Sequence, residues 1–249
     1  MPAPRTAALM VTCLVDLLYP AVGTAVVRLL RRHGVRVTLP DGQTCCGLPL
    51  FNSGYHGEAA AVARRTIALF SDAEAVVVPS GSCAWMVKAE YPHLVAGTAA
   101  ETTAARALAG KTYELSQFLV GALGATAMPV PAGPRRVTYH DSCHLLRGLG
   151  ESAAPRALIR GAGLDLAELP GADECCGFGG SFAVRLPDIS GAILRRKLES
   201  IRTTRAEAVI ACDAGCLLQL TGGLQAAGDR VRALHLAELL AGAEDDGAR

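Results

Sequence analysis

Cysteines in the first half of this 249-residue chain recur in the second half at a constant spacing. Three cysteine pairs are each separated by 130 positions (143 − 13, 175 − 45 and 176 − 46). They are Cys13 with Cys143, Cys45 with Cys175, and Cys46 with Cys176. Glycine follows both adjacent cysteine pairs, at Gly47 and Gly177. Because a fixed internal period indicates a repeated structural unit, the chain is predicted to fold as two similar halves.

A further cysteine closes each half, and here the halves differ. Cys83 closes the first half and Cys216 the second, 133 positions later (216 − 83). The second half also carries Cys212, whereas Pro79 stands at the corresponding position of the first half. The first half therefore offers four thiols and the second half offers five.

The composition indicates a globular protein with a large core and no strong charge preference for its partners. Hydrophobic residues make up 51% of the chain, and 24 lysines and arginines are balanced by 23 aspartates and glutamates. Such a chain can bury enough apolar surface to fold, while its small net charge creates no field that attracts nucleic acid or an anionic membrane. We expect neither of these as a partner.

The expected location is the cytoplasm. The sequence has no apolar stretch near the roughly 18 residues of a transmembrane helix, and Asp16 cuts short the apolar segment that would make a signal peptide. In a reducing cytosol, cysteines serve metals or redox chemistry more often than disulfides. The odd number of cysteines, nine, also excludes complete pairing.

Short apolar, β-branched runs alternate with helical periodicity in both halves. Strands are predicted at 8–12, 35–39, 75–78, 136–140, 164–169 and 208–211, and helices at 17–32, 56–70, 153–161 and 189–203, with a last amphipathic helix in each half at 113–119 and 234–240. This alternation predicts an α/β fold made of two tandem, pseudo-symmetric, Rossmann-like βαβαβ units with parallel sheets and helices on both faces. The first unit is expected to span 1–125 and the second 135–243, joined by a linker at 126–134 that is rich in Gly, Ala and Pro.

The cysteines fall at the carboxyl ends of the predicted strands, where loops converge and ligands bind in open α/β sheets. Thiols that are distant in sequence are therefore predicted to form one metal site in each unit. The expected ligands are Cys13, Cys45, Cys46 and Cys83 in the first unit, and Cys143, Cys175, Cys176, Cys212 and Cys216 in the second. Five thiols with an adjacent pair favour iron–sulfur chemistry, whereas four thiols also suit zinc.

Several other residues are expected to support the second site without binding the metal directly. Two histidines, His140 and His144, flank Cys143 and are predicted to donate hydrogen bonds or to pack. Gly177 can adopt a positive φ and let the backbone approach a bulky cluster, and the amides of the run that contains Gly179 and Gly180 are predicted to hydrogen-bond cluster sulfides. No catalytic residue is assigned.

The cysteine motifs resemble those of a known family. The matching segments are Pro79-Ser80-Gly81-Ser82-Cys83, His140-Asp141-Ser142-Cys143-His144 and Glu174-Cys175-Cys176-Gly177-Phe178-Gly179-Gly180. Over nearly its whole length the chain resembles the CCG cysteine-rich domain family, found as two tandem copies in one of the heterodisulfide reductase subunits and in the glycolate oxidase iron–sulfur subunit. Within this family it is most similar to the lactate utilization proteins.

The resemblance implies an iron–sulfur subunit of a cytoplasmic complex that oxidises L-lactate to pyruvate. It implies a 4Fe-4S cluster in the second unit, and it implies a ferredoxin-type iron–sulfur subunit and a third small subunit as partners. The first unit is left with a second iron–sulfur cluster, zinc, or an empty site. The G-x-G-x-x-A run at Gly148, Gly150 and Ala153 lies inside a cysteine unit rather than in a strand-to-helix turn, so it is discounted as a dinucleotide site. Without a flavin or nicotinamide site, we expect an oxidoreductase subunit that needs its partners rather than a complete dehydrogenase.

Two alternatives follow from the same residues. The cluster could attack a disulfide directly, as the resemblance to heterodisulfide reductase allows. Otherwise, the metal could be structural and hold a scaffold subunit that has no catalytic role.

Overall fold

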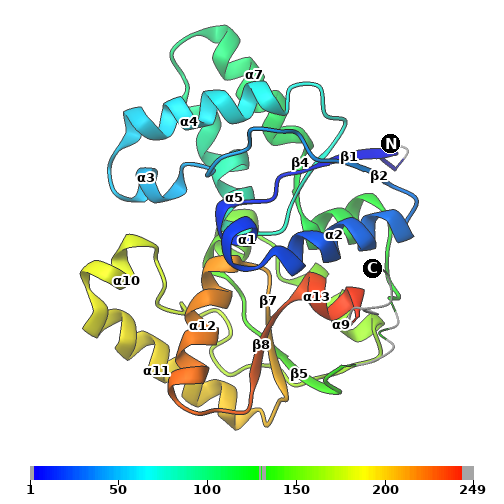
Figure 1. Ribbon diagram of the computed structural model, residues 1–249, viewed down its shortest axis with the longest axis vertical. Helices are drawn as coiled ribbons and strands as arrows, with labels where there is room; N and C mark the ends of the chain where they lie inside the picture. The colour runs from blue at the N-terminus through cyan, green and yellow to red at the C-terminus, as the bar shows by residue number, and fades with distance from the viewer. Residues whose placement is uncertain (1–2, 129, 131–132, 243–249) are drawn as a thin grey trace.

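The computed structural model describes residues 3–128, 130 and 133–242. They form two four-stranded sheets in which all paired strands are parallel (Figure 1). The strand order is β2-β1-β3-β4 in the first sheet and β6-β5-β7-β8 in the second, so the second sheet repeats the order of the first. The predicted α/β class, with two tandem units, is confirmed.

The strands are short and mostly buried. They are β1 (Thr6–Leu9), β2 (Arg36–Thr38), β3 (Val76–Val78), β4 (Thr112–Glu114), β5 (Arg136–Tyr139), β6 (Asp165–Leu166), β7 (Ala208–Ala211) and β8 (Arg232–His235). Fully buried strands such as Val76–Val78 and Ala208–Ala211 are those that helices cover on both faces.

Helices connect the strands in both halves. Those of the first half are α1 (Cys13–Leu18), α2 (Pro20–Arg32), α3 (Leu48–Asn52), α4 (His56–Leu69), α5 (Gly81–Trp85), η1 (Met86–Glu90), α6 (Tyr91–Leu94), α7 (Ala99–Lys111), α8 (Leu115–Gln117) and η2 (Phe118–Ala122). Those of the second half are η3 (His144–Gly148), α9 (Ala153–Gly161), α10 (Ser181–Arg185), α11 (Pro187–Thr203), α12 (Ala214–Ala226) and α13 (Leu236–Ala241).

The fourth strand of each sheet, β4 or β8, lies where the sequence predicts only a helix. Each of these strands runs directly into the following helix, because Glu114 and His235 end a strand and also cap α8 and α13. Because no turn residue separates the strand from the helix, the sequence pattern assigned the last residues of each strand to the helix that follows. The unit bounds 1–125 and 135–243 and the linker 126–134 stay predictions, and residues 1–2, 129, 131–132 and 243 lie outside the described part.

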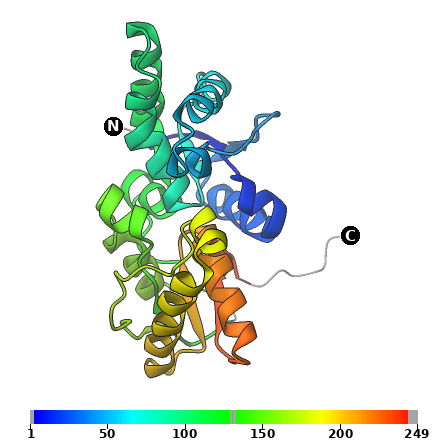
Figure 2. The ribbon, with the colours of Figure 1, turned by 90° about the vertical axis from the view of Figure 1, so that its left-hand side faces the viewer.

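Side chains that alternate along the strands divide the core into three layers. One face of each sheet, including Leu9 and Tyr139, packs into a central core that both halves share. The opposite faces pack into separate cores, with Met10 in the first half and Val209 in the second. Figures 1 and 2 show the two sheets in opposite ends of the molecule with helices between them and outside them.

The last helix of the second half joins the two halves. Helix α13 packs against α2 of the first half, and α8 packs against α9 of the second half. The Arg32 guanidinium donates to the carbonyl of Ala241, 3.0 Å away. In the described ranges 3–128, 130 and 133–242, no helix combines the length and apolarity needed to cross a membrane.

Candidate metal centre

Eight of the nine cysteines line a single cavity between the two halves, with a volume of about 200 Å³. They are Cys13, Cys45, Cys46 and Cys83 from the first half, and Cys143, Cys175, Cys176 and Cys216 from the second. Each group comes from three segments that follow the first three strands of its sheet. The predicted convergence at the carboxyl edges therefore occurs, and it brings both groups to the same space.

In the first group the thiols lie close to one another and to backbone amides. The Cys46 and Cys83 sulfurs are 3.2 Å apart, and the Gly47 amide donates to the Cys45 sulfur at 3.4 Å. Hydrogen bonds from Cys13 and Cys46 lower the pKa of Cys45 to about 3, so this sulfur is a thiolate at neutral pH. The Tyr91 hydroxyl fixes the loop by donating to the Cys46 carbonyl at 2.8 Å.

The second group repeats this geometry. The Cys176 and Cys216 sulfurs are 3.3 Å apart, and the Gly177 amide donates to the Cys175 sulfur at 3.3 Å. Hydrogen bonds from Cys143 and Cys176 lower the pKa of Cys175 to about 2. Four thiols that converge at these separations, one already ionised, are a donor set that fits an iron–sulfur cluster, and four thiolates also fit zinc.

Gly177 has a conformation that other residues rarely adopt. Its φ is +94°, and a Cβ atom there would lie 2.7 Å from the carbonyl oxygen of Ser190 in α11. The Ser190 hydroxyl donates to the Gly177 carbonyl at 2.8 Å and accepts from Gln219 of α12 at 3.0 Å. Gly177 therefore lets the cysteine loop approach α11, while Gly179 and Gly180 line the cavity itself.

Cys212 is the one predicted ligand that the structure does not bring to the cavity. Its side chain is fully buried in the central core that both halves share. Cys212 directly follows β7, and the side chain of Ala211 before it points to the other face of the sheet, toward the core that contains Cys176 and Cys216. Burial raises the pKa of the Cys212 thiol, so Cys212 stays protonated in the core.

The two helices that carry the closing cysteines share one carboxylate, that of Asp213. Its Oδ1 accepts from the amides of Gly215 and Cys216 at 3.0 and 3.3 Å, which caps α12. Its Oδ2 accepts from the Ser82 amide at 2.8 Å, which caps α5 of the other half, and from the Ser80 hydroxyl at 3.0 Å. Sequence reasoning missed Asp213, although an aspartate just before a helix start is a known capping signal.

The two histidines differ in position. His144 lines the cavity, its ring 4.6 Å from that of Trp85, and its Nδ1 is 3.9 Å from the Cys143 sulfur. His140 is fully buried outside the cavity lining, and neither ring nitrogen has a hydrogen-bond partner in the structure. Burial lowers the pKa of His140 to about 3, so the ring is neutral, and leaving it without a partner costs roughly 1–3 kcal/mol.

His140 nevertheless has sulfur neighbours. A ring nitrogen of His140 and the sulfurs of Cys176 and Cys216 all lie within 4.8 Å of one another. Lys197, which the sequence did not single out, is also buried, and its ammonium donates to the Gly171 carbonyl at 2.5 Å. Burial lowers the pKa of Lys197, while Glu174 and the sulfurs of Cys176 and Cys175 act in the opposite direction.

The rest of the cavity lining is largely apolar. Leu14, Leu48, Pro49, Phe178 and Ala214 contribute walls between the two cysteine groups. No arginine or lysine is part of this lining in the portion of the chain that the structure describes. The cavity therefore has thiols that can bind metal but no cation that would hold a small carboxylate.

Comparison with known proteins agrees with this geometry. The family model of the CCG cysteine-rich domain matches twice, at residues 7–88 and 137–221, and these two segments contain all nine cysteines. Lactate utilization protein A of Geobacillus thermodenitrificans is 45% identical over 233 residues, which cover 93% of this chain and 97% of that protein. The protein of the same name from Geobacillus kaustophilus is 46% identical over the same share of both chains.

A solved structure supports the fold independently. A hypothetical protein from Helicobacter pylori superposes with a TM-score of 0.63 at 11% sequence identity. The match covers 94% of this chain and 48% of that one, so this chain spans about half of the Helicobacter protein. From the repeated family match and the identity to full-length relatives, the chain belongs to the CCG cysteine-rich domain family.

Proposed function

We propose that this chain is the iron–sulfur subunit of a cytoplasmic complex that oxidises L-lactate to pyruvate. The observation that carries the proposal is the convergence of two matched groups of four thiols on one cavity. The lactate assignment rests on the relatives named lactate utilization protein A, which match over nearly their whole length. The second group holds a 4Fe-4S cluster, and the near-identical sulfur spacing of the first group favours a second cluster over zinc or an empty site.

In this proposal the chain carries electrons, and lactate binds to a partner. Oxidation of lactate to pyruvate releases two electrons and two protons, and iron–sulfur clusters, when bound, take up electrons singly. The cysteines hold the clusters, the Gly47 and Gly177 amides donate to ligand sulfurs, and the apolar walls limit access of water. Because the described lining offers no arginine or lysine to the lactate carboxylate, the substrate is expected to bind on a partner, such as a ferredoxin-type or a third small subunit.

Anaerobic purification and metal analysis test the cofactor. We expect a brown protein with about eight iron and eight sulfide per chain if both groups are filled, and about four of each if only the second is. Cys176→Ser should remove the iron and sulfide that the second half binds, and Cys46→Ser should remove those that the first half binds. Cys212→Ala, the matched control, should retain the full iron content, and loss of iron in this variant would make Cys212 a ligand after all.

Addition of lactate tests the reaction. Lactate should reduce the clusters only when the partner subunits are present, as followed by the bleaching of visible absorbance. A colourless zinc protein would contradict the redox role and leave a structural scaffold.

The shared cavity also allows an alternative function, disulfide reduction, which the same purified protein can test. An apolar space that two thiol groups face could also admit a disulfide. If disulfides oxidise the reduced protein while lactate and the partner subunits leave it unchanged, the chain is a disulfide reductase subunit instead.

A further inference from the structure

His140 is a buried polar side chain beside the second group of cysteines. It follows β5 directly, and its amide donates to the Ile210 carbonyl of β7 at 2.9 Å. The side chain is fully buried, and both ring nitrogens lack a partner. A buried imidazole in any protonation state has at least one N–H to donate, so this position supplies a donor that no described protein group uses.

Two sulfur atoms of the second group lie close to this donor. A ring nitrogen of His140 lies within 4.8 Å of the sulfurs of Cys176 and Cys216. Both cysteines line the cavity, whereas His140 does not. Because the two sulfurs line the cavity and His140 does not, we interpret the ring as a hydrogen-bond donor to a ligand sulfur rather than as a ligand of iron.

Neighbouring contacts hold the His140 segment in place. Asp141 forms two hydrogen bonds with the Arg156 guanidinium, at 2.8 and 2.7 Å, and its amide donates to the Ala172 carbonyl at 3.2 Å. The Arg156 guanidinium also lies over the ring of Tyr139, 5.0 Å from its centre. With both sequence neighbours fixed, the imidazole has little freedom to turn away from the sulfurs.

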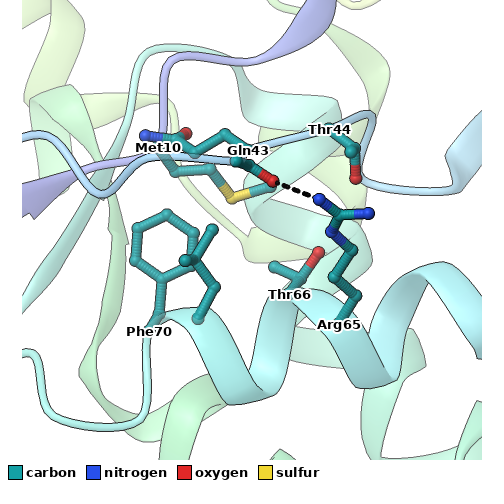
Figure 3. A pocket seen from close by; sticks show the side chains of 8 residues that line it. Met10, Gln43, Thr44, Arg65, Thr66 and Phe70 are labelled. Carbon is teal, nitrogen blue, oxygen red and sulfur yellow. Dashed lines mark hydrogen bonds between the residues drawn. The ribbon is translucent and has the colours of Figure 1, made fainter.

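The first half carries methionine at the equivalent position, 130 residues earlier. Met10 is buried in the same core as Cys46 and Cys83, the counterparts of Cys176 and Cys216. Figure 3 shows its thioether next to Phe70 and Thr66, within a pocket that Arg65 closes through a bond to the Gly42 carbonyl. A thioether has no hydrogen to donate, so the two cysteine groups differ at this position.

We propose that His140 is a positioning residue that donates an N–H···S hydrogen bond to the Cys176 or Cys216 thiolate and thereby favours the reduced form of the second-half cluster. The inference rests on the proposed function, since it requires a cluster in that group. A hydrogen bond to a ligand sulfur stabilises negative charge, and the reduced cluster carries one more negative charge than the oxidised one. The hydrogen bond therefore raises the reduction potential of the second-half cluster relative to the same site without a donor.

Two substitutions at His140 separate hydrogen bonding from packing. His140→Leu removes the donor at similar volume, and His140→Gln keeps an N–H donor. In an anaerobic redox titration, His140→Leu should lower the ratio of reduced to oxidised second-half cluster about tenfold at a fixed potential, which is about 59 mV for a one-electron couple. His140→Gln should recover most of this shift, and Met10→Leu should shift neither cluster.

Each redox transition is assigned to the first-half or the second-half cluster by comparison with Cys46→Ser and Cys176→Ser. Iron and sulfide are measured in each sample. An unchanged potential in iron-replete His140→Leu, or equal shifts in the Leu and Gln variants, would overturn this inference alone. Absence of iron and sulfide from the wild type would overturn the proposed function, and this inference with it.

A second readout keeps His140, so it stands even if a His140 variant fails to fold. The protein carries His144→Phe, which removes the histidine beside the Cys143 sulfur, and it is labelled with nitrogen-15 histidine. Its reduced second-half cluster should show a weak nitrogen coupling in pulsed electron paramagnetic resonance. A strong coupling, as from a nitrogen bound to iron, or no coupling at all would contradict the hydrogen bond.

Discussion

At the scale of single residues, Gly177 gives a direct prediction. Gly177→Ala adds a Cβ atom 2.7 Å from the Ser190 carbonyl at a φ of +94°, so the loop must move and carry Cys175 and Cys176 with it. We expect a loss of about 1–3 kcal/mol in unfolding free energy and loss of second-half iron.

The control is Gly34→Ala, which has a φ of +75° but nothing within 4 Å of the added atom. It should keep its iron and lose only the smaller cost of backbone strain. Equal iron content in both variants, measured by metal analysis, would show that the close approach to α11 is unimportant for the site.

The sequence pointed to the cysteines of the cavity more clearly than to the residues around them. Eight of the nine cysteines meet at the cavity. Cys212 could not be judged from spacing, because the face to which its side chain points depends on its position relative to the end of β7. Asp213 can be recognised from the sequence as the cap of its own helix, but its bonds to Ser80 and Ser82 join elements that are distant in sequence, and no local pattern reveals these bonds or the burial of Lys197.

At the scale of helices and strands, periodicity recovered the alternating pattern but not the junctions. The helix at Ala153–Gly161 and the strand at Ala208–Ala211 have their predicted bounds. The fourth strands were missed because Glu114 and His235 serve two elements at once. Strand pairing across a sheet is a long-range contact, and it leaves little trace in a segment of three or four residues.

The shared capping of α5 and α12 gives a prediction for these elements. In Asp213→Asn, one carboxylate oxygen is replaced by an NH₂ group that faces donors, so one of the two helices loses its cap. We expect the unfolding free energy to fall by about 2 kcal/mol or more in urea denaturation. Asp165→Asn, which breaks an exposed ion pair with Arg136, is the control and should cost less than about 1 kcal/mol.

At the scale of the whole molecule, the central core makes the two halves interdependent. Residues of both sheets, such as Leu9 and Tyr139, pack into it, and the cavity needs walls from both. The sequence predicted the repeat but not this shared core, since periodicity says which face of an element is apolar and not which element covers it.

A shared core predicts cooperative unfolding. Trp85, the one tryptophan in the sequence, belongs to the first half and contacts His144 of the second. In anaerobic urea denaturation, its fluorescence and the far-ultraviolet circular dichroism of the whole chain should change over the same concentration range. Two separate transitions would instead indicate halves that fold independently.

The bond between Asp213 and Ser80 also bears on how such a chain can evolve. These residues occupy the same place in the two halves, three positions before the closing cysteine. They are hydrogen-bonded to each other where the two halves meet. A protein made of two first halves would set serine against serine and leave both helices without a carboxylate. One made of two second halves would press two buried carboxylates together. Because the two positions differ, neither half can take the place of the other at this contact.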